Sequence, residues 1–111
     1  MSPEFADLAR RAIACRHWRW MPGMLTDVGE RVTDAAAFYL GTLPDLSDPL
    51  TVQALLLLVR EAWGTQTAWV EPGHDGLWEM CIYVHGKCQM LASYQTEAEA
   101  LVAALEVDHD R

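Results

Sequence analysis

The segment 50–63 has both of its ends marked, and it constrains the fold more than any other part of the chain. Its residues are apolar on nearly all sides of a helix, with four consecutive leucines at its centre. Ser47 or Asp48 can cap this helix, Pro49 suits its first turn, and Gly64 stands where glycine commonly ends helices. A helix with so little polar surface predicts burial, so we expect it to be the central buried helix.

Three β-strands are predicted after this helix, at 66–71, 77–84 and 87–94. Turn-forming residues separate them at 72–76 and again near His85-Gly86, a pattern typical of an antiparallel meander. The second and third strands each carry one apolar face, formed by Trp78, Met80, Ile82 and Val84 and by Cys88, Met90, Ala92 and Tyr94.

The turn between these two strands decides which of their faces meet. Side chains alternate along a strand, so a two-residue loop would place even-numbered residues opposite odd-numbered ones. A three-residue loop keeps the apolar faces together, and we therefore expect it. The other face of the sheet is mixed, too aromatic for plain solvent exposure and too polar for a deep core: Thr67, Trp69, Glu71, Glu79, Cys81, Tyr83, Gln89 and Leu91.

Two further helices are predicted at the ends of the chain. Residues 2–14 begin with Ser2 as a possible cap and Pro3 at the first position, and apolar residues then recur at three- and four-residue spacing. Thr96 with Glu99 forms a capping box that starts an alanine-rich helix at 97–105. Between the first two helices we expect only a turn at Pro22-Gly23 and a small hairpin within 24–33.

The order helix, irregular segment, helix, three strands, helix indicates an α+β fold. We predict a small helix/sheet/helix sandwich with a three-stranded antiparallel meander and about three helices, as a single globular domain over residues 1–111. The composition agrees, because 51% of the 111 residues are hydrophobic and 22% are charged, as in ordinary globular domains.

Charge and apolar runs narrow the classes of function. A formal net charge of -8 argues against DNA binding, which needs neutralisation of phosphates. The purely apolar run 54–59 is far too short to span a membrane, and the N-terminus lacks the pattern of a signal peptide. Three cysteines without a dense framework favour reduced thiols. We expect a cytoplasmic protein without a membrane partner.

The strongest candidate binding site is a basic and aromatic segment that follows the first helix. Guanidinium groups bind phosphates bidentately and tryptophan rings stack on bases, so the segment predicts a site for a small phosphate-containing ligand. Its members are Arg11, Arg16, His17, Trp18, Arg19 and Trp20. In the alternative interpretation the tryptophans cover a sheet face and the arginines pair with acidic residues. Trp69 and Tyr83 of the mixed face are the candidate interface residues.

Neither a catalytic nor a metal site is predicted. Cys15 and His17 form a possible nucleophile and base, but no third partner and no glycine-rich elbow accompany them. A metal site from Cys81, His85 and Cys88, with His74, is disfavoured because the expected register places Cys81 and Cys88 on opposite faces. We therefore expect no enzyme and no cofactor.

Four stretches together resemble small proteins of phages and prophages, in particular the phage ABA-sandwich domain family. They are LARRAIACRHWRWMPGM, LLLLVREAW, the strand meander with its tryptophans and TEAEALVAALE. The resemblance covers most of the chain, although residues 25–43 match nothing in the family. It implies a helix/sheet/helix sandwich without catalytic residues, in a phage context where small accessory proteins often bind and disable a host component.

Three hypotheses for function follow. The first is a non-catalytic phage-type binding protein that inhibits or sequesters a host protein, as a counter-defence protein acting on a bacterial antiviral system. The second is a sponge that binds a signalling nucleotide through the Arg/Trp segment. The third is a structural accessory protein whose exposed aromatic residues form a homodimer or larger homo-oligomer. The acidic surface either steers the protein toward a basic partner or only confers solubility.

Overall fold

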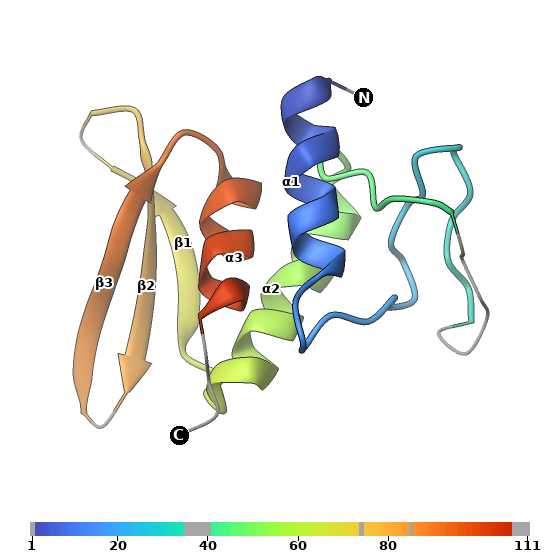
Figure 1. The fold of residues 1–111 in the computed structure, drawn as a ribbon. Coiled ribbons are helices and arrows are strands. Elements are labelled where there is room, and N and C mark those ends of the chain that lie inside the picture. The colour runs from blue at the N-terminus through green and yellow to red at the C-terminus, as the bar shows by residue number, and fades with distance from the viewer. Residues whose placement is uncertain (1, 35–40, 74, 85, 108–111) are drawn as a thin grey trace.

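The computed structural model describes residues 2–34, 41–73, 75–84 and 86–107, and within them three helices accompany a three-stranded sheet (Figure 1). The elements follow in the order α1, α2, β1, β2, β3, α3. This confirms the α+β class, the meander and the helix, sheet, helix order along the chain. The hairpin predicted within 24–33 is present in minimal form, as a single β-bridge between Leu25 and Arg31. A second bridge, between Thr26 and Pro44, lies outside the predicted hairpin.

Side-chain caps start the helices at the predicted positions. The Ser2 hydroxyl accepts a hydrogen bond of 3.3 Å from the Phe5 amide at the start of α1 (Pro3–Ile13). Thr96 accepts one of 3.0 Å from the Glu99 amide at the start of α3 (Glu97–Glu106). Each cap satisfies an amide that has no partner inside its helix, which is why these sequences begin helices here.

The second helix, α2 (Pro49–Trp63), begins at Asp48 and ends at Gly64, whose φ of 66° lies in the left-handed region. The Asp48 carboxylate accepts hydrogen bonds of 3.0 Å from both the amide and the hydroxyl of Thr51. It also pairs at 2.6 Å with Arg31. This ion pair joins the irregular segment before α2 to the helix that follows it.

The helix at the centre of the molecule is α3, so the prediction that α2 is central is wrong. α3 packs against all three strands on one side and against α1 and α2 on the other (Figure 1). Six of its ten residues are buried, and alanines among them permit the close approach on both sides. α2 instead leaves Leu50 51% exposed on its outer surface.

The sheet consists of β1 (Ala68–Pro72), β2 (Trp78–Val84) and β3 (Lys87–Tyr94), in that spatial order and antiparallel throughout. Val84 pairs with Lys87, so two residues, not three, separate the paired positions and the three-residue loop is wrong. Gly86 supplies the positive φ, 76°, that a tight turn requires.

A shift of register between Glu79 and Cys81 resolves the mismatch of faces that the short turn creates. Such an irregularity adds one residue to one strand and reverses the pairing parity beyond it. Past the shift, Trp78 lies opposite Tyr94, apolar against apolar as predicted. The register therefore changes along the hairpin instead of being set once at its turn.

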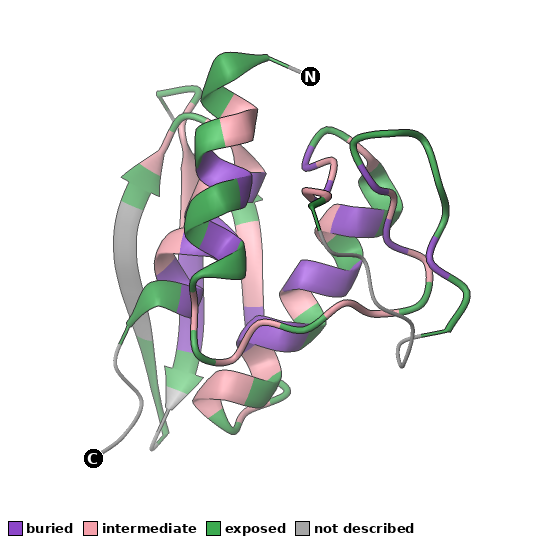
Figure 2. Cartoon of the chain, turned by 45° about the vertical axis from the view of Figure 1, so that its right-hand side comes forward, coloured by how far each residue is buried: buried purple, intermediate pink, exposed green. Residues whose placement is uncertain are grey.

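Buried apolar residues from the helices, the sheet and the irregular segment form a common core (Figure 2). Met24, Val32 and Leu46 of the irregular segment lie in the same cluster as Leu101 of α3 and Met80 of β2. The segment between α1 and α2 is thus held by its own apolar anchors as well as by the Arg31–Asp48 pair.

Candidate functional site

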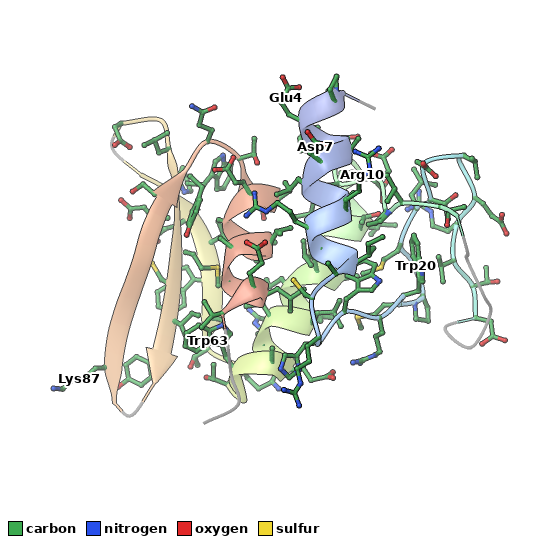
Figure 3. The ribbon with its side chains drawn as sticks, in the orientation of Figure 1. Glu4, Asp7, Arg10, Trp20, Trp63 and Lys87 are labelled. Atoms are coloured by element: carbon green, nitrogen blue, oxygen red, sulfur yellow. The ribbon has the colours of Figure 1, made fainter. Side chains whose placement is uncertain are left out.

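The tryptophans of the basic and aromatic segment pack on the protein itself. Trp18 and Trp20 are both half-buried and lie against the core cluster. Trp20 is labelled in Figure 3. Their ring centroids are 5.6 Å apart with an interplanar angle of 75°, the edge-to-face geometry that aromatic pairs prefer. Each ring thereby contributes to holding the chain against the core as it leaves α1.

Two of the predicted ligand-binding arginines form bidentate ion pairs with acidic residues of distant helices. Arg11 donates to Glu106 of α3 at 2.6 and 3.0 Å, and Arg19 donates through both Nη atoms to Glu61 of α2. The hydrogen bond that Arg11 donates to Glu106 raises the pKa of Arg11, and the one that Arg19 donates to Glu61 lowers the pKa of Glu61. The two guanidinium groups are therefore bound to different helices.

Part of the segment nevertheless lines a pocket of about 450 Å³ where α1 and α3 end. Arg11, Arg16 and His17 meet there, whereas Trp18, Arg19 and Trp20 do not line it. The remaining lining residues are Ala14, Cys15, Leu105, Glu106 and Val107. The structure thus brings together half of the predicted ligand-binding residues and places an acidic side chain among them.

Cys15, the candidate nucleophile, lies in the wall of this pocket. Its thiol donates a hydrogen bond of 3.3 Å to the backbone carbonyl of Arg11. Burial raises the pKa of Cys15, and the charge of Glu106 acts in the same direction. A raised pKa favours the neutral thiol, whereas the thiolate is the nucleophilic form.

The second candidate surface is the face of the sheet that carries Trp69 and Tyr83. The helices lie on the other side of the sheet (Figures 1 and 2), and no described helix packs on this face. Trp69 pairs with Cys81, and Tyr83 pairs with Cys88. We call these four residues, with Glu71 and Glu79, the open face.

Both cysteines of the sheet belong to the open face, so the prediction that they point to opposite faces is wrong. The two-residue separation between Val84 and Lys87 changes the parity of β3 and brings Cys88 beside Tyr83. Cys88 is exposed and Cys81 is buried. Burial is the main cause that raises the pKa of Cys81 to about 11.

Two carboxylates occupy directly opposite positions at one end of the open face, since Glu71 of β1 pairs with Glu79 of β2. The Cys81 thiol lies 3.8 Å from one oxygen of Glu71. Arg10, Arg11, Arg19 and Arg31 form ion pairs in the described part of the chain, and none of these four pairs includes either glutamate.

No family model, curated protein or solved structure matches this chain. The resemblance to the phage ABA-sandwich domain family stays a prediction. None of the described helices has the length and apolar character needed to cross a membrane. Across residues 2–34, 41–73, 75–84 and 86–107, no group of three or more His, Cys, Asp or Glu side chains is placed to hold a metal ion. His74 and His85 lie outside the described residues.

The alternative interpretation, in which the arginines pair with acidic residues, is confirmed for Arg11 and Arg19. Sequence reasoning did not identify their partners, and it missed the pairing of the two glutamates. Glu106 is 95 residues from Arg11, and no local pattern relates residues at such a distance. The Glu71–Glu79 pair had no direct signal either, because a symmetric turn at 72–76 would place Glu71 opposite Leu77, two residues away from its observed partner.

Proposed function

We propose that this chain is a non-catalytic binding protein that sequesters or inhibits a partner protein through the open face. The observation that carries the proposal is the exposure of aromatic side chain on a sheet face that no described helix covers. Tyr83 is 45% exposed and Trp69 is half-buried, on neighbouring strands. Tyrosine and tryptophan are enriched at the centres of protein interfaces.

The composition of the face supports this assignment. An antiparallel sheet that covers a core on one side normally alternates with polar residues on its solvent side. Here the middle of that side carries Trp69, Cys81, Tyr83 and Cys88 instead. A rigid strand scaffold also presents these side chains without the entropic cost of ordering a loop.

The resemblance to small phage proteins directs the search for the partner. It implies that the partner is a host protein, and we propose a component of a bacterial antiviral system. Such a role needs no catalytic residue in this chain.

The test compares the affinity of the wild type for the partner protein with the affinities of variants that each change one exposed side chain. The chain is expressed with an affinity tag in a bacterial host, and proteins that co-purify in stoichiometric amount are identified by mass spectrometry. Tyr83→Gln is expected to weaken binding of the purified partner at least about tenfold, because aromatic residues at interface centres commonly contribute this much.

Leu50→Gln is the matched control, because Leu50 is similarly exposed and lines a pocket of about 700 Å³ on the helix side. Circular dichroism checks that both variants fold. Equal binding by wild type and Tyr83→Gln would contradict the proposal. Dissociation of a homodimer by Tyr83→Gln, with no other protein bound, would instead establish the homo-oligomeric accessory role.

A second candidate function has its own observation: Arg11, Arg16 and His17 line one pocket. It supports a sponge for a small phosphate-containing ligand such as a signalling nucleotide. Native mass spectrometry of protein purified gently from a bacterial cytoplasm tests it. The sponge predicts an adduct of nucleotide mass that is lost on unfolding and in Arg16→Ala, whereas bare protein would contradict it.

A further inference from the structure

Glu71 and Glu79 bring two side chains of like charge to directly opposite positions of the sheet. Side chains at directly opposite positions of an antiparallel pair have Cβ atoms about 5 Å apart, and like charges there are destabilising. Glu71 is exposed and Glu79 is half-buried on adjacent strands. The Glu71 carboxylate lies toward Cys81 and the Glu79 carboxylate toward Gly73. The two negative charges together attract a cation to this end of the face.

Several described arginines bind partners away from the acid pair. Arg11, Arg19 and Arg31 pair with acids on the helix side, and Arg60 donates to the backbone carbonyl of Ala68. Lys87 lies at the opposite end of the sheet, at the β2–β3 turn (Figure 3). The acid pair is thus a local negative charge for which the described ion pairs provide no compensation.

The acid pair is continuous with the aromatic part of the open face. Glu71 lies two residues from Trp69 on the same strand, and Glu79 lies two residues from Cys81, which pairs with Trp69. Alternation along the strands places all four side chains on one face. A cation held by the carboxylates would therefore lie beside an indole ring.

This combination matches one class of side chain. A guanidinium group binds carboxylates bidentately and also stacks on aromatic rings, and an ammonium group satisfies the same charge with weaker geometry. We propose that the open face binds a basic segment of the partner protein, with an arginine or lysine held by Glu71 and Glu79 beside Trp69. This inference rests on the proposed function and specifies the chemistry of its partner.

Charge favours such a partner over a second copy of this chain. The formal net charge is -8, and stacking two open faces would bring two acid pairs into one interface. Like charges brought together at an interface oppose association. A basic partner segment instead gains from the same field, in its rate of association as well as its affinity.

The test uses three short synthetic peptides that share apolar residues and differ at their basic positions. One carries arginines, the second carries citrulline (the same shape without the charge), and the third carries glutamates. Binding to the full chain is followed by NMR through the indole N–H of Trp69. The arginine peptide is expected to shift this signal and to bind at least about tenfold more tightly than the citrulline peptide.

The double variant Glu71→Gln/Glu79→Gln is expected to abolish the difference between the arginine and citrulline peptides. The control variant Glu4→Gln/Glu30→Gln removes the same amount of charge from exposed positions outside the sheet. It is expected to keep the difference in binding between the arginine and citrulline peptides. Equal binding of the arginine and citrulline peptides, or no shift of Trp69 by any peptide, would overturn the inference. Neither result would affect the proposed function, because that is tested with the partner protein and Tyr83→Gln.

Discussion

The two sides of the sheet differ in how far their apolar side chains are buried and their charged side chains are paired within the protein. On the helix side, apolar residues of β1 and β2 are buried beneath α3, and Arg11, Arg19 and Arg31 are paired with acids. On the open face, aromatic side chains are exposed and two glutamates oppose one another. The helix side thus maintains the fold, and the contrast supports the proposal that the open face binds a partner.

The basic and aromatic segment belongs to the helix side, where side chains maintain the fold. Its sequence has the composition of a ligand site, yet its tryptophans pack on the core and two of its arginines hold helix ends. Composition alone does not distinguish residues that bind a ligand from residues that bind the rest of the chain.

The largest expected contrast between the two sides concerns the free energy of unfolding. Leu101→Ala removes a fully buried side chain beneath the sheet and is expected to cost about 2–5 kcal/mol. Tyr83→Ala, on the open face, is expected to cost less than about 1 kcal/mol, within the range of surface substitutions. Urea denaturation measures both, and a similar loss for Tyr83→Ala would show that the open face also maintains the fold.

The Arg31–Asp48 pair predicts a dependence of stability on pH. The hydrogen bond from Arg31 is the main cause that lowers the pKa of Asp48, and those from Thr51 add to it. Because its pKa is lowered, the Asp48 carboxylate stabilises the fold fully at pH values above the ordinary aspartate pKa of about 3.9. This stabilisation is lost as the pH falls through the lowered pKa of the folded state.

Asp48→Asn is therefore expected to cost about 1–2 kcal/mol at pH 7, because the ion pair is lost. The cost is expected to shrink as the pH approaches the lowered pKa. Denaturation of wild type and variant at several pH values measures it. A cost that does not change between pH 7 and acid conditions would show that the charge of Asp48 is not what stabilises the start of α2.

A smaller effect is expected for the ion pair between α2 and the segment after α1. Arg19 and Glu61 are both exposed, and exposed ion pairs contribute about 0–1 kcal/mol. A double-mutant cycle with Arg19→Ala and Glu61→Ala measures the coupling, which is expected to decrease in high salt. A coupling free energy of zero would show that the ion pair with Glu61 does not contribute to stability.

An effect of similar size but opposite sign is expected on the open face. Glu79→Gln removes the repulsion with Glu71 and is expected to stabilise the free protein by about 0.2–1 kcal/mol. Thermal unfolding at low salt measures it, with Glu4→Gln as the control. A destabilised Glu79→Gln variant would show that the carboxylate has a structural partner.

Local signals explain which features of the fold could be predicted. Ser2, Asp48 and Thr96 cap helices through hydrogen bonds to residues three positions later, so a short window of sequence contains both members of each bond. The strands and the α+β class follow in the same way from alternation and turn residues.

Features that depend on distant residues were predicted less well. The turn after β2 is shorter than its hydrophobic pattern indicates, because the shift near Glu79 restores apolar pairing further along. High apolar content does not by itself place a helix at the centre, as the exposed Leu50 of α2 shows. The alanines of α3 are less apolar than the leucines of α2, but they permit contact with the sheet and with α2 together. For the site, Trp69 and Tyr83 were found as candidates, whereas Glu71 was not.

The most direct test of the open face as the binding surface is photo-cross-linking in living cells from two positions. A photoreactive phenylalanine analogue replaces Tyr83 on the open face or Leu50 on the helix side, two residues with similar exposure, 45% and 51%. We expect a cross-link to one partner protein from position 83 and not from position 50. A partner captured from position 50 alone would contradict the assignment and would place binding on the helix side.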